Sequence, residues 1–294
     1  MLDDNQFPVD VYAKSSTKST SLVEECMLLA NKCVANFISK KSKELKLRTN
    51  LPFLYRVHEE PDAKKIKEVM AFIANFGYQT PKKISNSKEI NKLLAEFEDR
   101  PEKAIVNQVL IRSMAKAIYS HSNIGHYGLG FKEYSHFTSP IRRYPDLVIH
   151  RALKEYIHES PNASRIAFLR QFMKDVAQHT SNTERLAMEA ERASVKLTHT
   201  VLAQSFIGEE FIGTITGVTS FGIFVQLDRI YSEGLLHIRD LDDDYYIFDE
   251  ANYCLIGRSK KKKYALGQQL SVKITKVNVD KRTIDLIPSN KKGR

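Results

Sequence analysis

The hydrophobic pattern of the chain changes near residue 207, and this change limits the folds that the chain can adopt. Before that point apolar residues recur with helical spacing, and two long helices are expected at 146–158 and 162–206. After Gly208, short segments alternate apolar and polar residues with the period of a half-buried strand. The two parts of the chain therefore need different architectures.

The second part contains five short strand segments in roughly 80 residues, which favours a small barrel of the OB type. These strands are expected at 211–218, 222–227, 234–238, 270–274 and 283–286. The predicted fold class is α+β. A mostly helical domain spans 1–206, a five-stranded OB-type β-barrel spans 207–288, and a basic tail occupies 289–294.

Shorter elements are expected in the first part. A helix should run from Leu22 to Ile38, with Ser21 as its N-cap and Glu24 as the capping-box partner. Residues 1–12 are typical of a hairpin turn followed by a strand. The remaining segments are a strand or extended piece at 51–57 and helices at 61–75, 90–97 and 104–119, the first of these helices being capped by Gly77.

The charge balance is strongly basic. Lys and Arg number 45 against 35 Asp and Glu, which gives a net charge of +10 and favours a polyanionic partner, either nucleic acid or an anionic membrane surface. No apolar run approaches the roughly 18 residues that a membrane span needs, so no membrane-spanning segment is expected. Three cysteines without CxxC spacing indicate reduced thiols and a cytoplasmic protein. Cys26 and Cys33, seven residues apart, are expected to face the core together.

Two prolines bracket the segment with the most chemistry, which runs from His136 to Leu147 and contains Arg142 and Arg143. Pro140 and Pro145 restrict the backbone on either side of the arginine pair. The pattern predicts a rigid loop that leads into a helix N-terminus. Such a loop presents guanidinium groups and backbone N–H groups to an anion, most naturally a phosphate. The alternative is that the arginines pair with carboxylates at a domain junction.

This segment, together with residues 125–130, Tyr134 and residues 23–31, resembles the signature of the ribonuclease R / ribonuclease II (RNB) family of 3′→5′ exoribonucleases. The ribonuclease R branch fits better, and the likeness runs along nearly the whole chain. The resemblance implies the C-terminal part of an RNB catalytic domain followed by a barrel. It also implies that Arg142 contacts the scissile phosphate region and stabilises developing negative charge, with Arg143 as the alternate candidate.

The resemblance also implies RNA contacts in the helical part. Glu24 matches a residue that contacts the ribose of the terminal nucleotide, although negative charge in the first turn of a helix would also explain it. His126 is either an RNA contact or a structural histidine. The further RNA-binding candidates in the signature are Tyr127, Ser139 and Tyr144.

The barrel is similar to RNA-binding barrels of the ribosomal protein S-one type. In that family the positions of Phe221, Phe224 and His237 stack on RNA or line it, although Phe224 could equally belong to the barrel core. Phe221 lies beside small residues and is expected to be exposed. Lys261 and Lys262 belong to a basic run that should follow a phosphate backbone.

The family's hydrolysis resembles two-metal phosphodiester cleavage, with magnesium held by clustered aspartates. In the family these aspartates lie upstream of the segment at 23–31, and residues 1–22 contain no such cluster. Asp3 and Asp4 are interpreted as turn residues, and the aspartates at 240–244 as a solvated loop. Magnesium is therefore expected for the family, but no metal ligand is predicted in this chain.

The leading hypothesis is the C-terminal portion of an exoribonuclease that hydrolyses RNA from the 3′ end to nucleoside 5′-monophosphates, with single-stranded RNA as its partner. The chain alone is expected to be inactive. One alternative is a non-catalytic RNA-binding module that keeps the barrel and a phosphate loop. Another is a complementing subunit of a split exoribonuclease, whose N-terminal half would lie on a separate chain.

Overall fold

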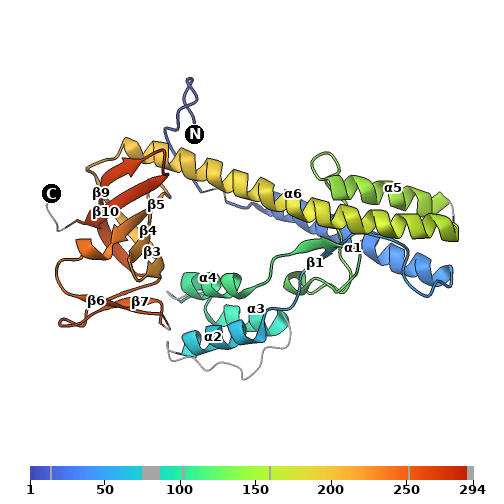
Figure 1. Cartoon of the computed structure of the whole chain (residues 1–294), viewed down its shortest axis with the longest axis horizontal. Helices are drawn as coiled ribbons and strands as arrows, with labels where there is room; N and C mark the ends of the chain where they lie inside the picture. Colours follow the sequence, from blue (N-terminus) through green and yellow to red (C-terminus); the bar gives the residue numbers. More distant parts are fainter. Residues whose placement is uncertain (14, 75–86, 101–102, 159, 251, 290–294) are drawn as a thin grey trace.

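The computed structural model describes residues 1–13, 15–74, 87–100, 103–158, 160–250 and 252–289. A β-barrel lies at one end of the molecule and a helical unit at the other (Figure 1). The helix α6 (Ala163–Gln204) spans the distance between them, and the short helices α2 to α4 lie below it in the same view. No helix among the described residues is long and apolar enough to cross a membrane.

Most of the predicted helices are present. The apolar positions expected on the second helix, Ile66, Val69, Met70 and Ile73, are all buried. The predicted cap at Gly77 lies outside the described residues. The helices of the first part are α1 (Lys18–Glu44), α2 (Ala63–Ala74), α3 (Ser87–Glu96), α4 (Lys103–Ser113) and α5 (Tyr144–His158), with a 3-10 turn, η1, at Tyr127–Leu129.

The start of α1 differs from the prediction. Thr17 is the N-cap, and it exchanges hydrogen bonds with Thr20 in a capping box. Ser21 is therefore not the cap, because Thr17 and Thr20 form the same reciprocal arrangement one turn earlier. Glu24 consequently lies beyond the first turn, where the helix dipole has little effect on it.

The helix predicted to run to Tyr119 ends at Ser113. The chain then forms β2 (Ile118–Ser120), which pairs antiparallel with β1 (Tyr55–Val57). Tyr119 is buried from this strand, so the apolar residues after Ser113 follow strand spacing rather than helical spacing. Pairing with β1, a partner distant in the sequence, decides this conformation, and local periodicity does not detect it.

The five predicted strands are present and form a closed barrel in the order β10-β5-β4-β3-β9, in which β5 and β10 pair in parallel. Along β4 the side chains of Ile223, Val225 and Leu227 are fully buried, whereas Phe224 points to the other face and is half-buried. The strands are β3 (Glu210–Thr219), β4 (Gly222–Leu227), β5 (Glu233–His237), β9 (Gln269–Asn278) and β10 (Thr283–Pro288).

A second sheet, which the sequence did not reveal, lies between β5 and β9. It consists of β6 (Tyr246–Asp249), β7 (Cys254–Gly257) and β8 (Lys263–Ala265), preceded by a 3-10 turn, η2, at Ile238–Asp240. Its strands are only three or four residues long, which is too short for a clear alternation.

Two further expectations are wrong. Cys26 and Cys33 are exposed, not directed to the core, and only Cys254 is buried. The N-terminal segment forms its predicted turn, in which Asp3 accepts hydrogen bonds from the N–H groups of Asn5 and Phe7. The strand expected after this turn is reduced to a single bridge between Leu2 and Pro8.

The core of the helical unit joins elements that are distant in the sequence. Ala35 and Ile38 of α1 share one cluster with Ile149 of α5 and with Met173 and Ala177 of α6. These contacts hold α1, α5 and the first part of α6 together around the strand pair β1–β2.

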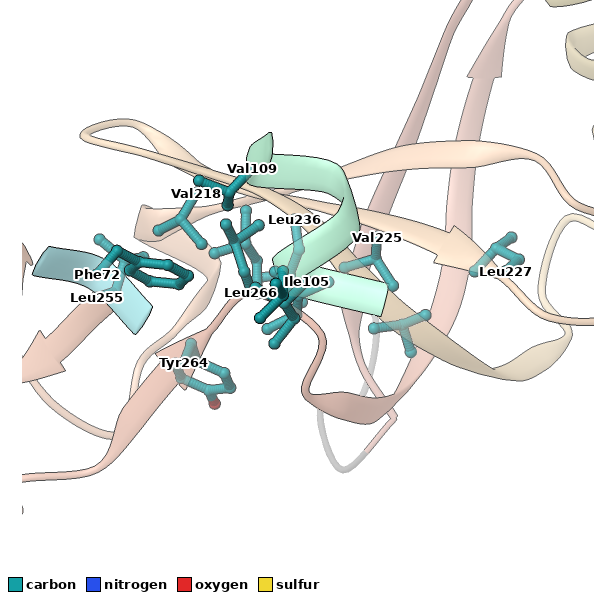
Figure 2. Packing of buried hydrophobic residues seen from close by; sticks show 14 of the residues in the cluster. Phe72, Ile105, Val109, Val218, Val225, Leu227, Leu236, Leu255, Tyr264 and Leu266 are labelled. Atoms are coloured by element: carbon teal, nitrogen blue, oxygen red, sulfur yellow. The ribbon is translucent and has the colours of Figure 1, made fainter. Parts of the chain in front are cut away.

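The helices α2 to α4 belong to a different cluster, which they share with the barrel. Figure 2 shows Ile105 and Val109 of α4 beside Val218, Leu236 and Leu266 of the barrel. The side-chain amide of Gln108 and the guanidinium of Arg112 donate hydrogen bonds to the carbonyl of Thr216, at 3.0 and 3.2 Å. The barrel is therefore docked on α4 through a buried apolar contact with a polar margin.

Gly267 makes this close contact possible. Its φ of +75° favours glycine, and a Cβ built there would lie 2.4 Å from Cγ1 of Ile105. We expect Gly267→Ala to lower the free energy of unfolding by roughly 1–2 kcal/mol for the left-handed backbone and a further 1–3 kcal/mol for the overpacking. Urea titration measures the change.

Gly208→Ala is the matched control, because Gly208 has φ +93° and no neighbouring atom within 4 Å of the added Cβ. It should cost only the backbone contribution. Equal destabilisation by the two substitutions would show that Ile105 does not restrict residue 267.

Candidate nucleic-acid interface

The segment between the two prolines forms a turn anchored by one buried carboxylate. The backbone N–H groups of Arg142 and Arg143 donate to the carbonyl of Ser139, at 3.3 and 3.0 Å. Oδ2 of Asp146 accepts from the backbone N–H of Ser139 at 2.8 Å. Since Asp146 lies in the first turn of α5 and is 0% exposed, it fixes the loop against the start of that helix.

The same carboxylate oxygen holds Arg143. Nε and Nη2 of Arg143 donate to Oδ2 of Asp146, at 3.1 and 2.7 Å. Pairing with a carboxylate, which the sequence left open for both arginines, therefore occurs for Arg143. A guanidinium held in this way neutralises the buried charge and has less freedom to turn toward a ligand.

Arg142 is arranged differently. It is exposed, and it makes no side-chain hydrogen bond or ion pair within the described part of the chain. The adjacent Ile141 is fully exposed, and Tyr144 is also exposed. The loop thus presents one unpaired guanidinium and one aromatic ring to solvent.

An aromatic and cationic cluster, which was not recognised in the sequence, lies beneath the loop. The Arg56 guanidinium stacks over the Tyr119 ring at 4.7 Å and pairs with Glu184 of α6 at 2.6 Å. The hydroxyl of Tyr119 shares a hydrogen bond of 2.9 Å with Nδ1 of His136. Burial, together with the positive charges of Arg143 and Arg56, lowers the pKa of His136 to about 3. His136 is therefore a neutral member of this cluster.

The helix α1 touches the loop through Asn31. Its side-chain amide donates to the Tyr134 hydroxyl at 3.1 Å and its carbonyl accepts from the backbone N–H of Phe137 at 2.8 Å. The Phe137 ring in turn stacks on His150 of α5 with centroids 4.0 Å apart. Glu24 is exposed on the same helix, seven residues or about 10 Å before Asn31.

His126 and Tyr127 lie in a second loop and not in the cluster around Arg142. Nδ1 of His126 accepts from the backbone N–H of Leu129, and burial followed by the charge of His58 lowers the pKa of His126 to about 4. His58 accepts from the N–H of Gly128, where a Cβ would lie only 2.8 Å from its Nδ1. These contacts agree with the structural interpretation of His126. Both residues also line an open hollow that contains Lys88 and Lys132.

The barrel presents its three predicted residues close together. Phe221 is 47% exposed, as expected, and it meets the half-buried Phe224 edge to face at 6.1 Å between centroids. Gly222 pairs with His237, which places His237 on the strand adjacent to these rings. The arrangement leaves aromatic surface available for base stacking.

The acidic loop has a role that the sequence did not predict. Asp243 pairs with Lys262 at 2.9 Å, and Asp244 accepts from the backbone N–H groups of Ser259 and Lys260. The bond from Lys260 is the main reason that the pKa of Asp244 is lowered. The loop is therefore not merely solvated, because its carboxylates hold the basic loop in place. Lys261 is exposed between these contacts.

No group of three or more His, Cys, Asp or Glu side chains within the described ranges is placed to share a metal ion. Asp3 uses its carboxylate to close the N-terminal turn. The described residues therefore do not offer a fitting site for the magnesium that the resemblance implies.

The class that this fold defines is a helical unit with an arginine loop, joined to an RNA-binding type of barrel. An RNB domain matches residues 1–159 and an S1 RNA binding domain matches residues 204–287. Because the RNB match covers more than half of the 294 residues, the chain belongs to the RNB family.

Individual relatives agree with this assignment. The chain is 37% identical over 292 residues to Ribonuclease R of Thermotoga maritima, which covers 98% of this chain and 40% of that protein. It is 38% identical over 283 residues to Ribonuclease R of Escherichia coli, covering 93% of this chain and 34% of that protein. The chain thus spans about two-fifths of the curated relatives or less.

A solved structure shares the fold. The apo form of Mycoplasma genitalium RNase R matches with a TM-score of 0.88 and 30% identity, over 98% of this chain and 44% of that one. The same relative has also been solved in complex with ribose methylated single-stranded RNA, with the same TM-score.

The two arginines should differ in their effect on stability. We expect Arg143→Ala to lower the free energy of unfolding by about 3 kcal/mol, because it strands the buried Asp146 carboxylate. Arg142→Ala should leave stability within about 0.5 kcal/mol, as is usual for an exposed side chain. Adding Asp146→Asn to Arg143→Ala should recover part of the loss. Equal urea midpoints for the two single variants would contradict this division.

The buried histidine should make stability depend on pH. The unfolded chain protonates His136 near pH 6.5, whereas the folded protein does so only near pH 3, so stability is present above pH 6.5 and is lost as the pH falls through this window. The loss from His136 is at most about 1.4 kcal/mol per pH unit. His136→Gln should flatten the profile measured by urea unfolding. His121→Gln, at an exposed position, is the control for removing a histidine.

Proposed function

We propose that this chain supplies the arginine loop and the RNA-binding barrel of a ribonuclease R-type 3′→5′ exoribonuclease, which hydrolyses RNA to nucleoside 5′-monophosphates. The observation that carries the proposal is the loop itself, in which Asp146 holds Arg143 and leaves Arg142 exposed and unpaired among the described residues. A guanidinium in a fixed backbone is suited to bind a phosphate and to stabilise charge that develops on it.

Within this proposal the two arginines have different roles. Arg142 contacts the scissile phosphate region, whereas Arg143 is a positioning residue that acts through Asp146. Glu24, exposed on α1, accepts hydrogen bonds from ribose hydroxyls at the 3′ end. Ser139 and Tyr144 belong to the same loop, and the exposed ring of Tyr144 is available to the RNA.

The barrel supplies binding that does not depend on sequence. Phe221 and Phe224 offer stacking surface, and His237 lies on the adjacent strand. Lys261 and the net charge of +10 favour a phosphate backbone. Lys262 contributes less, because Asp243 already neutralises part of its charge.

Hydrolysis would need magnesium held by aspartates outside the described residues, since these do not gather a carboxylate cluster. When bound, the metal would activate water and stabilise the leaving oxygen. The cytoplasmic location inferred from the cysteines stays a prediction.

A non-catalytic RNA-binding module is the second candidate, and the same lack of a described carboxylate cluster favours it. Both candidates bind RNA, and they differ in chemistry. Release of mononucleotides from end-labelled RNA by the purified chain, abolished by EDTA, would exclude the non-catalytic candidate.

The proposal predicts that the chain binds single-stranded RNA without sequence preference and that affinity falls steeply as salt rises. Phe221→Ala should weaken binding by about 1–3 kcal/mol, or roughly 5- to 150-fold. Fluorescence anisotropy with labelled oligoribonucleotides of several sequences measures both effects.

Phe168→Ala is the matched control, since Phe168 is an exposed aromatic residue on α6 and not on the barrel. Equal losses for Phe168→Ala and Phe221→Ala, or no binding at low salt, would contradict the proposed role of the barrel.

A further inference from the structure

Two stretches of helix have no covering layer. Every residue of α1 from 18 to 26 is exposed, and so is every residue of α6 from 185 to 193. Both helices are packed elsewhere, where Ala35 and Ile38 of α1 share a cluster with Met173 and Ala177 of α6. Each helix therefore continues from a packed region into a bare one.

These bare stretches carry apolar side chains that a solvent-facing helix does not need. Leu22 and Val23 of α1 are 66% and 58% exposed, and Leu29, one turn beyond the stretch, is 62% exposed. Leu186 and Met188 are exposed on α6. Isolated helices of about two turns are marginal in water, and apolar residues on such a helix usually mark a face that packs against another element. We refer to residues 18–29 of α1 and 185–193 of α6 as the uncovered helical surface.

The position of this surface identifies what covers it. Asn31 bonds to Tyr134 and Phe137, so the uncovered part of α1 begins directly beside the arginine loop. Glu24 projects from the same stretch. A carboxylate cluster that acts on a phosphate at Arg142 has to approach from a neighbouring element, and the described residues contain no such cluster.

The length of the relatives indicates the source of that element. More than half of the Mycoplasma genitalium RNase R chain has no counterpart here, because the present chain covers 44% of it. We propose that the uncovered helical surface binds a segment that carries the carboxylate cluster of an RNB catalytic domain, on the same polypeptide or on a separate one. This inference rests on the proposed function and adds to it the surface through which the active site is completed.

The chain has its own reporters for this contact. Cys26 and Cys33 are exposed on α1, at the uncovered stretch and just beyond it, whereas Cys254 is buried in the barrel region. A maleimide should therefore label Cys26 and Cys33 of the isolated chain and spare Cys254. Loss of labelling at Cys26 would report coverage of α1.

The probe is the part of Mycoplasma genitalium RNase R that this chain does not match. It is fused before Met1 through a flexible linker and, in a second arm, co-expressed as a separate chain. The expected result is loss of Cys26 labelling in both arms, read by mass spectrometry, and co-purification in the second. A folded fusion, with Cys254 still unlabelled, in which Cys26 reacts as fast as in the isolated chain would overturn the proposal.

A variant pair tests the surface directly. Leu22→Asp combined with Leu29→Asp should restore Cys26 labelling in the fusion and weaken co-purification by about tenfold or more, as expected for charges placed in a buried contact. Ile157→Asp, at an exposed apolar residue of α5 outside the surface, should preserve protection. Equal effects of the two substitutions would contradict the assignment.

RNA binding measured on the same samples separates this inference from the proposed function. Intact RNA binding with Cys26 still reactive in the fusion rejects the surface alone, whereas loss of RNA binding by the isolated chain rejects the proposed function. Protection of Cys26 in the isolated chain that rises with its concentration, together with dimers in light scattering, would identify a second copy as the occupant and overturn the proposal.

Discussion

The buried carboxylate of Asp146 is the interaction on which the candidate site depends. A charge with no solvent exposure is stable only when donors surround it, and here a backbone N–H and two guanidinium N–H groups meet one oxygen. The same contacts determine the loop, because they join Ser139 to the start of α5 and hold Arg143 in between. Arg142, the next residue in the turn, is left outside this network. The selection of one arginine from the pair is thus a consequence of how a buried charge is satisfied.

The docking of the barrel on α4 is the second constraint, and it gives the two parts of the chain a defined relation. Ile105 lies against Gly267, and Gln108 and Arg112 donate to the Thr216 carbonyl. An apolar contact with hydrogen bonds at its margin is the usual anatomy of a specific interface. The helices α2 to α4 share their core with the barrel rather than with α1, α5 and α6. The packing units of the molecule therefore do not coincide with the boundary at which the sequence pattern changes.

How far the sequence could predict this arrangement depended on the range of the interactions. The long helices and the barrel strands have clear periodicity, and both were found. Tyr119 could not be assigned correctly, because its strand exists only through pairing with β1. The exposure of Cys26 was missed because helical spacing shows which residues share a face, but not whether that face is covered. In the site, the signature pointed to the arginine pair, but only the contact with Asp146 distinguishes Arg142 from Arg143.

The net charge of +10 overstates how much positive charge is available to a polyanion. Asp146 neutralises Arg143, Glu184 pairs with Arg56, and Asp243 pairs with Lys262, so several cations nearest to the candidate interface already have partners. His136 and His126 are neutral near pH 7, because burial lowers the pKa of both. What the interface offers is therefore a small number of exposed cations on a rigid frame, such as Arg142. Since each phosphate contact releases counterions, the number of these exposed cations, rather than the total charge, determines how strongly salt opposes binding.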